Sequence, residues 1–188
     1  MRIISGTFRG KKIIEPKDFK TRPLKDLTKE SIFNIIDHSS KFKVQLFGSN
    51  VLDLFSGVGS FGIECLSRGA NKVIFAENYQ GVLSILKKNL INLKSTSSYK
   101  IIEKDIYKEN TLLMLNEFFD IIFLDPPYRD RNIGRIFETI EKSKILKRNG
   151  IIILHRHKKE KNFIPKNFKI VEEKQYGISK INFINLLS

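Results

Sequence analysis

The chain has 188 residues, of which 41% are hydrophobic, including 15 phenylalanines. That apolar content is enough for one domain with a sizeable core and excludes an intrinsically disordered chain. Its one cysteine, Cys65, excludes an internal disulfide and a thiolate metal cluster, which favours a reducing compartment, so we expect the cytoplasm. No apolar run approaches the roughly 20 residues of a membrane span, and the first residues lack the apolar core of a signal peptide. We expect neither export nor insertion into a membrane.

The net charge of +14 is concentrated at the two ends of the sequence. Residues 1–50 carry a net charge of +6, residues 51–128 carry −1, and residues 129–188 carry +9. A lysine-rich composition alone would spread the charge more evenly, so we favour a polyanionic partner such as nucleic acid. A solvated basic surface without such a partner is the alternative.

Short apolar runs alternate with segments of helical periodicity through most of the chain. Helical spacing indicates helices at 81–93 and 133–146, and this alternation predicts βαβ units and a parallel sheet with both faces covered. The candidate strands of this part are residues 51–55, 73–76, 99–103, 120–124 and 150–154.

The end of the chain breaks this alternation. Residues 168–176 and 180–187 flank Gly177-Ile178-Ser179 with no helix between them, which predicts an antiparallel hairpin. The predicted fold is therefore a doubly wound, mostly parallel seven-stranded α/β sheet that ends in an antiparallel hairpin.

The first 50 residues are predicted to form a basic N-terminal extension to a domain at 51–188. Segments 2–5 and 11–14 indicate a basic hairpin, and Thr28 is predicted to cap a helix that runs to about Ser39.

A glycine-rich loop follows the first predicted strand. Gly57, Gly59 and Gly62 fit the pattern G-x-G-x-x-G and open a helix, an arrangement that lets the backbone approach a nucleotide-like ligand. The alternative is a plain tight turn. A dehydrogenase would bind a diphosphate here, but Asp53 just before the loop suits an ammonium group better.

Two further carboxylates follow the next predicted strands. Glu77 ends the second strand, where a carboxylate can accept both ribose hydroxyls of an adenosine. Asp105 follows the third strand, where it can accept from the adenine amino group while Ile106 packs on the ring. An ordinary loop aspartate is equally compatible with that position.

Asp125-Pro126-Pro127-Tyr128 follows a buried apolar strand and is the most specific signal in the chain. The two prolines end the strand because neither has an N–H to donate. A rigid strand exit would need neither the aspartate before them nor the aromatic residue after them. The Asp125 carboxylate and the Pro126 carbonyl can both accept from one NH₂ group while Tyr128 stacks on a base.

This arrangement suits methyl transfer to an exocyclic base nitrogen. Two acceptors favour a pyramidal nitrogen and stabilise the positive charge that develops on it. S-adenosylmethionine as methyl donor requires neither a metal nor a covalent nucleophile, and we expect no metal. His38, His155 and His157 lack partners at metal-ligand spacing. We expect His155 at a strand end on the basic side, and Cys65 as a packing residue.

Taken together, these residues resemble the RsmD family, the bacterial methyltransferases that act on N2 of guanine 966 in 16S ribosomal RNA. The resemblance is nearly full length. It includes residues 1–12, Thr21-Arg22-Pro23, residues 29–34, the Asp53 loop, residues 66–70 and Asp125-Pro126-Pro127-Tyr128.

The resemblance implies a function and a set of site residues. The partner would be 16S ribosomal RNA in the assembling small subunit, and we expect a monomer. Asp125, Pro126, Pro127 and Tyr128 would hold the guanine amino group. The expected cofactor site consists of Asp53, Phe55, Ser56, Gly57, Gly59, Glu77, Asn78, Asp105 and Ile106. The residues expected to face RNA are Arg2, Arg9, Lys11, Lys12 and Arg22.

Other functions remain open at this point. The four-residue strip serves any planar base with an NH₂ group, so DNA or RNA adenine-N6 methylation is the first alternative. An NAD-dependent oxidoreductase would share the glycine loop and Glu77 but has no use for the strip. A catalytically silent ribosome-assembly protein would use only the basic ends.

Overall fold

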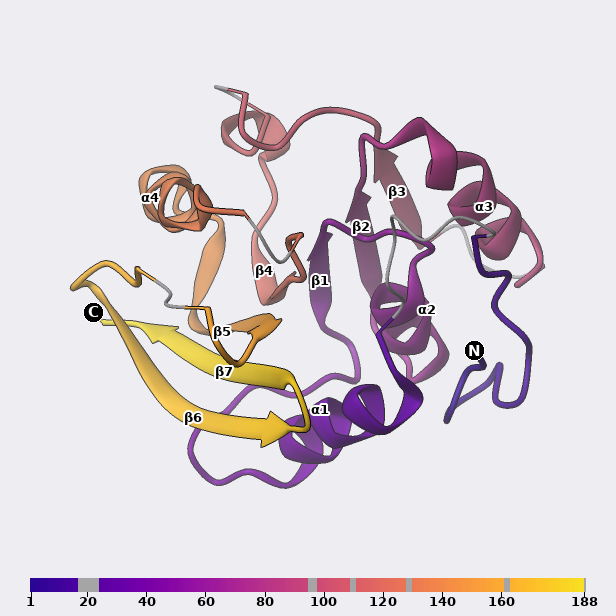
Figure 1. Cartoon of the computed structure of the whole chain (residues 1–188), viewed down its shortest axis with the longest axis horizontal. Coiled ribbons are helices and arrows are strands. Elements are labelled where there is room, and N and C mark those ends of the chain that lie inside the picture. The colour runs from indigo at the N-terminus through magenta and orange to yellow at the C-terminus, as the bar shows by residue number, and fades with distance from the viewer. Residues whose placement is uncertain (17–23, 95–97, 109–110, 128–129, 161–162, 188) are drawn as a thin grey trace.

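The computed structural model describes residues 1–16, 24–94, 98–108, 111–127, 130–160 and 163–187. Its centre is a seven-stranded sheet in the order β3-β2-β1-β4-β5-β7-β6 (Figure 1). The strands are β1 (Asn50–Leu54), β2 (Lys72–Ala76), β3 (Tyr99–Ile102), β4 (Phe119–Leu124), β5 (Leu146–His157), β6 (Phe168–Tyr176) and β7 (Ser179–Leu186). The helices are α1 (Asp26–His38), α2 (Ser60–Ser67), α3 (Gln80–Ile91) and α4 (Ile133–Ser143), with a short 3₁₀ helix η1 (Leu113–Leu115).

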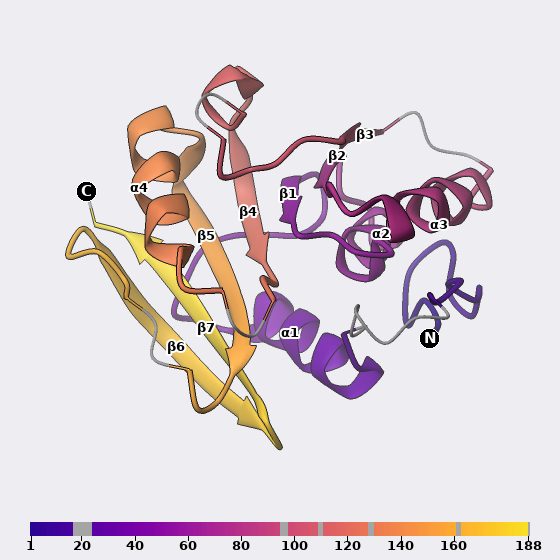
Figure 2. The same cartoon turned by 45° about the horizontal axis from the view of Figure 1, so that its top comes forward.

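The strand directions confirm the predicted sheet. The first five strands pair in parallel, and β7 lies antiparallel between β5 and β6. Figure 2 shows the β6-β7 hairpin extending along one side of the sheet. The mostly parallel α/β fold with an antiparallel hairpin is that of the class I S-adenosylmethionine-dependent methyltransferases.

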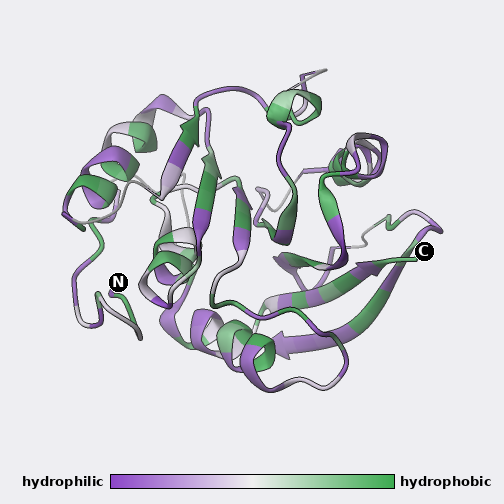
Figure 3. Cartoon of the chain, turned by 180° about the vertical axis from the view of Figure 1, so that it is seen from behind, coloured by the Kyte–Doolittle hydropathy of each residue, from purple (hydrophilic) through white to green (hydrophobic). Residues whose placement is uncertain are grey.

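Helices cover both faces of the sheet, as the apolar strands predict. Val51 and Leu52 are neighbours on β1 whose side chains point to opposite faces. Val51 joins a buried cluster with residues of α1, α2 and α3, whereas Leu52 joins one with residues of α4 and η1. In Figure 3 much of the hydrophobic colour lies on the central strands, whereas the arrowhead half of β6 is hydrophilic and the helices alternate between the two colours. Cys65 is fully buried in α2, as expected of a packing residue.

The N-terminal segment packs against the same core. Ile3, Phe8 and Ile13 belong to the buried cluster that contains α1 and α2. The predicted hairpin is reduced to a single antiparallel bridge between Arg2 and Lys12. Backbone hydrogen bonds from Ile3 to Lys11 and from Ile13 to Met1 extend this turn without forming strands.

A buried ionic cluster fastens this segment to the domain. The Glu64 carboxylate accepts hydrogen bonds from the backbone N–H groups of Ile4 at 2.8 Å and Ser5 at 2.9 Å. Lys29 Nζ lies 3.6 Å from the same carboxylate and donates to the Arg2 carbonyl at 2.8 Å. Burial lowers the pKa of Lys29, and the negative charge of Glu64 opposes this shift.

Two predictions about helix ends were wrong. The first helix begins at Asp26 after Lys25, and Thr28 is buried inside it, so Thr28 is not its cap. The fourth helix ends at Ser143, because Lys144 adopts a left-handed conformation with φ 52°. β5 therefore starts at Leu146, extends to His157 and is longer than the predicted 150–154. Among the described helices, none is long and apolar enough to span a membrane.

Candidate active site

A cleft of about 1360 Å³ opens at the carboxyl ends of the central strands. The chain order of the sheet reverses between β1 and β4, and open α/β sheets bind ligands at such a reversal. Asp53 of β1, Glu77 after β2, Asp105 after β3 and Asp125 after β4 all line the cleft. The fold thus brings together the four carboxylates that the sequence analysis selected.

The glycine loop forms one wall of the cleft. After β1, Phe55 takes a left-handed conformation with φ 62°, which is uncommon for a bulky residue and often marks a functional turn. Ser56 Oγ donates to the carbonyls of Asp53 and Ala76, both at 3.0 Å. Gly59 has φ 85°, and a Cβ there would lie 2.6 Å from Leu86 Cδ1. Any other residue at this position would be strained.

The Asp53 carboxylate is buried at the base of the loop. Its Oδ2 accepts a hydrogen bond from the Gly62 N–H at 3.0 Å, which holds the first turn of α2 against β1. Burial raises the pKa of Asp53 well above its usual range, and the negative charges of Asp125 and Glu77 raise it further. The Gly62 N–H opposes this shift. A cationic ligand group would stabilise the ionised form of Asp53.

Glu77 joins the glycine loop to the start of α3. Its Oε2 accepts from the Gly57 N–H at 2.8 Å, and its Oε1 accepts from the N–H groups of Asn78 at 2.9 Å and Tyr79 at 2.8 Å. A carboxylate offers about four acceptor sites. Three are used here, so capacity for a ligand hydroxyl is left.

The loop after β3 contacts the loop after β4. Asp105 Oδ1 accepts from the Tyr107 N–H at 2.9 Å, and the Tyr107 hydroxyl donates to Asp130 Oδ2 at 2.6 Å. The Tyr107 ring also lies 5.9 Å from the Phe55 ring, centre to centre. Ile106 is buried and lines the cleft.

The strand exit at Asp125 is held by the neighbouring strand β5. Arg156 is 1% exposed, and its guanidinium donates to the carbonyls of Pro127 at 3.2 Å and Asp130 at 2.8 Å. Asp125, Pro126 and Pro127 line the cleft. Tyr128, the fourth residue of the predicted strip, lies outside the described residues.

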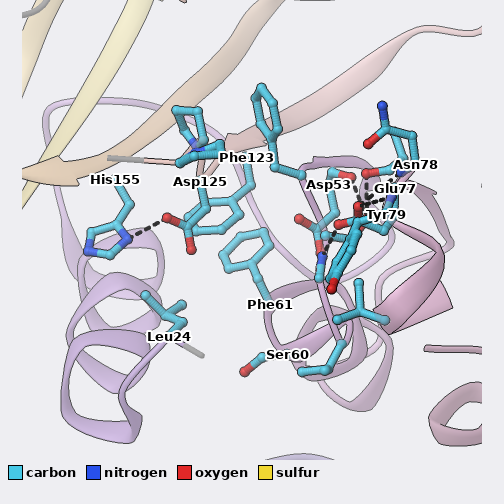
Figure 4. Close-up of a pocket in the computed structure, with 18 of the residues that line it drawn as sticks. Leu24, Asp53, Ser60, Phe61, Glu77, Asn78, Tyr79, Phe123, Asp125 and His155 are labelled. Atoms are coloured by element: carbon cyan, nitrogen blue, oxygen red, sulfur yellow. Dashed lines mark hydrogen bonds and ion pairs between the residues drawn. The ribbon is translucent and has the colours of Figure 1, made fainter. Parts of the chain in front are cut away.

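His155 is a site residue that the sequence analysis missed. Its Nδ1 lies 2.8 Å from Asp125 Oδ1, and the imidazole lines the cleft (Figure 4). Burial lowers the pKa of His155, but the charge of Asp125 and the hydrogen bond to it outweigh burial and raise this pKa above its usual value. The register of β4 and β5, which pairs Leu124 with Leu154, places the next residues of both strands side by side. The sequence alone could not place His155 beside Asp125, because it does not predict this register.

The charged side chains that line the cleft are mainly acidic, although the chain as a whole is basic. Seven of its described lining residues are carboxylates and two are lysines. The carboxylates are Glu15, Asp26, Asp53, Glu77, Asp105, Asp125 and Asp130, and the lysines are Lys25 and Lys104. Figure 4 shows Asp53 and Asp125 on adjacent parts of the wall with Phe61 and Phe123 near them. This charge favours a cationic ligand over an anionic one.

The residues predicted to face RNA are exposed where the structure describes them. Arg2, Arg9, Lys11 and Lys12 all lie at the surface of the N-terminal turn, and Lys11 Nζ lies 4.9 Å from the centre of the Phe8 ring. Arg22 lies outside the described residues. Within the described ranges, no group of three or more His, Cys, Asp and Glu side chains is arranged to hold a metal ion.

Comparison with known proteins places the chain in a family. The family described as conserved hypothetical protein 95 matches residues 1–185. The chain belongs to this family. Over 183 residues it is 33% identical to the ribosomal RNA small subunit methyltransferase D of Haemophilus influenzae. The aligned region covers 95% of this chain and 90% of the relative.

Solved structures share the fold. The Escherichia coli protein yhhF superposes with a TM-score of 0.83 at 24% identity, covering all of this chain and 98% of the other. A protein described as a methyltransferase and solved in complex with SAH superposes with a TM-score of 0.64 at 18% identity, covering 85% of this chain and 50% of the other. At these identities, both similarities concern the fold.

Proposed function

We propose that this protein transfers a methyl group from S-adenosylmethionine to the exocyclic N2 of a guanine in 16S ribosomal RNA, guanine 966 by resemblance to the RsmD family. The observation that carries the proposal is the position of Asp125-Pro126-Pro127 on the wall of an acidic cleft, next to the glycine loop. The relative from Haemophilus influenzae named as a small subunit methyltransferase supports the choice of substrate.

The cleft residues fit this cofactor. S-adenosylmethionine carries a sulfonium and an ammonium group, so the buried Asp53 and the surrounding carboxylates complement its positive charge. Glu77 retains acceptor capacity for the ribose hydroxyls. Asp105 and Ile106 lie together on the same wall, where they would contact the adenine.

The residues around Asp125 would act on the target base. The cofactor supplies an activated methyl group, so the chain needs to hold and polarise the amine in line with it. The Asp125 carboxylate and the Pro126 carbonyl would accept from the two N–H bonds of the amine, which localises its lone pair. The carboxylate also stabilises the positive charge that grows on the nitrogen. Arg156 holds the Pro127 and Asp130 carbonyls and so fixes the loop that bears these acceptors.

The same charge distribution argues against the oxidoreductase alternative. A dinucleotide places its diphosphate at the glycine loop, where the buried Asp53 carboxylate of this chain faces the cleft. Adenine-N6 methylation uses the same acceptors and is separated from guanine-N2 methylation only by the substrate.

The test is methyl transfer to defined substrates. The purified protein would be incubated with methyl-labelled S-adenosylmethionine and with small-subunit particles from cells that lack its gene, and the modified nucleotide would be mapped. We expect N2-methylguanine at one position of 16S RNA. Label at an adenine, or transfer restricted to duplex DNA, would reject the proposed substrate. Binding of NADH without binding of SAH, the demethylated form of the cofactor, would reject methyltransferase activity altogether.

A further inference from the structure

We propose that His155 is the positioning residue for Asp125, and that its neutral form makes Asp125 competent for methyl transfer. This inference rests on the proposed function. It adds a role for a residue that lies on β5, outside the Asp125-Pro126-Pro127 strip.

The geometry gives His155 one specific partner. The pairing of Leu124 with Leu154 sets the Asp125 side chain beside that of His155, and Nδ1 of the imidazole lies 2.8 Å from Oδ1 of the carboxylate. His155 is 5% exposed, so its ring is held in place by its surroundings. In Figure 4 the second carboxylate oxygen points toward the space between His155 and Phe61. His155 thus fixes one oxygen and leaves the other for the amine.

The protonation state of His155 sets the charge that the amine meets. A carboxylate can only accept a hydrogen bond, so Nδ1 carries the hydrogen whenever Asp125 is ionised. The pair then has a net charge of −1 when the imidazole is neutral and of zero when it is protonated. Both forms orient the carboxylate, but only the neutral imidazole leaves the negative charge of Asp125 uncompensated.

That difference matters in the transfer step. The amine nitrogen forms a bond to the methyl carbon, the carbon–sulfur bond breaks with its electron pair staying on sulfur, and the nitrogen becomes positive. One N–H proton then passes to Oδ2 of Asp125 and on to water. A pair with charge −1 stabilises the positive nitrogen and accepts the proton, whereas a neutral pair does both poorly.

The groups around His155 decide the direction in which its pKa shifts. The charge of Asp125 and the hydrogen bond to it outweigh burial and raise the pKa of His155, and the neighbouring Arg156 opposes that rise. On β7, His155 pairs with the uncharged Ile181, and Lys180 lies opposite Arg156. Across the cleft, β1 contributes Asp53, and the start of α1 contributes Lys25 and Asp26. Because the folded pKa is raised, the imidazolium form persists to higher pH than in a free histidine.

The first experiment measures the pH dependence of kcat for methyl transfer to small-subunit RNA. We expect the kcat of the wild type to fall as the pH decreases through the pKa of His155. His155→Asn should lose this acid limb, because its amide can donate to Asp125 but does not titrate. His155→Leu should lower kcat by roughly 10- to 100-fold with SAH affinity unchanged, since misplacing reacting groups by about 1 Å costs about 100-fold. His157→Asn, on the same strand, is the control and should keep the wild-type profile.

The second experiment needs no turnover. The imidazole C–H signals of His155 and His157 would be followed by NMR as a function of pH. Asp125→Asn should lower the pKa of His155. An unchanged His155 titration, or an acid limb retained by His155→Asn, would overturn the role of His155 alone. Absence of methyl transfer by the wild type would overturn this inference together with the proposed function.

Discussion

The Tyr107 hydroxyl donates to Asp130 Oδ2 at 2.6 Å and so connects the loop after β3 with the loop after β4. The first of these loops contains Asp105 and Ile106 on the proposed cofactor side, and the second follows Asp125-Pro126-Pro127 on the substrate side. Burial, together with the hydrogen bond to Asp130 and the charge of that residue, raises the pKa of Tyr107. The phenol therefore remains a donor throughout the neutral range.

Removing the Tyr107 hydroxyl should weaken the connection between the loop after β3 and the loop after β4. Tyr107→Phe keeps the ring contact with Phe55 and removes the bond to Asp130. A hydrogen bond to a charged group contributes about 1.5–3 kcal/mol, and Tyr107 is only half-buried, so we expect the lower end, a decrease in kcat of about 10-fold. SAH affinity by calorimetry should change little. Tyr99→Phe, on β3 outside the cleft, is the control, and equal losses in both variants would contradict the role of the Tyr107 hydroxyl.

Glu77 should contribute strongly to cofactor affinity. Glu77→Ala removes the acceptors proposed for the ribose and also releases the Gly57 N–H of the glycine loop. We expect SAH binding to weaken by about 1.5–3 kcal/mol, the scale for hydrogen bonds to a charged group. Calorimetry measures this change. Glu117→Ala breaks an ion pair with Lys72 at the amino ends of the strands, away from the cleft, and this control variant should bind SAH normally. Wild-type SAH affinity in Glu77→Ala would exclude Glu77 from the site.

Local sequence patterns predicted the five parallel strands well because each of them contains an apolar run. The prolines after Leu124 and the glycines after Leu54 marked two strand exits, and their place at one edge followed from the parallel arrangement. The antiparallel hairpin followed from the short Gly177 turn with no helix between its strands.

The errors lie where long-range contacts decide the structure. Thr28 has the side chain of a helix cap, but its burial inside α1 outweighs that preference. Glu64 carries no motif, yet it binds the N-terminal segment through partners 59 and 60 residues away. His155 was expected at a strand end on the basic side and was given no role in the site. Its proximity to Asp125 depends on the register of β4 and β5, which the sequence did not specify.

The buried Glu64 should matter for folding more than for chemistry. Glu64→Gln removes the buried counter-charge of Lys29 and leaves only the partly exposed Asp26 carboxylate, 3.8 Å from Lys29 Nζ; loss of a buried partner typically costs about 3–5 kcal/mol. For a domain of this size we expect the Tm to fall by roughly 6–20 °C. Glu103→Gln breaks an exposed pair with Lys87 and should cost at most about 1 kcal/mol. Thermal unfolding of the two variants provides the comparison, and equal Tm values would show that the buried pair adds no stability.

Asp125 should be needed for turnover and not for cofactor binding. Asp125→Ala removes the carboxylate that polarises the amine, and we expect kcat to fall about 100-fold or more. Asp125→Asn should retain more activity because an amide oxygen still accepts one N–H. Asp120→Asn, at the amino end of the same strand, controls for damage to β4. Near-normal kcat in Asp125→Ala, measured by single-turnover methyl transfer, would remove Asp125 from the mechanism.

The basic N-terminal turn should bind phosphates of the RNA substrate. Each phosphate that a cation neutralises releases counterions, so the affinity for RNA should fall steeply with salt. Arg9, Lys11 and Lys12 are exposed on this turn. Changing all three to Ala should reduce the slope of log affinity against log salt by roughly two to three units, provided that each contacts a phosphate.

The control for this variant is a second set of three cations on the opposite face of the sheet. Lys142, Lys147 and Arg148 lie at the end of α4 and the start of β5, so their combined replacement by Ala removes the same charge but should leave most of the salt slope. Both variants should bind SAH as the wild type does, because neither set lines the cleft. Equal slopes in the two variants would mean that net charge alone attracts RNA. A slope reduced only in the N-terminal variant would locate the contact, since counterion release depends on which cations meet phosphates and not on the total charge of the protein.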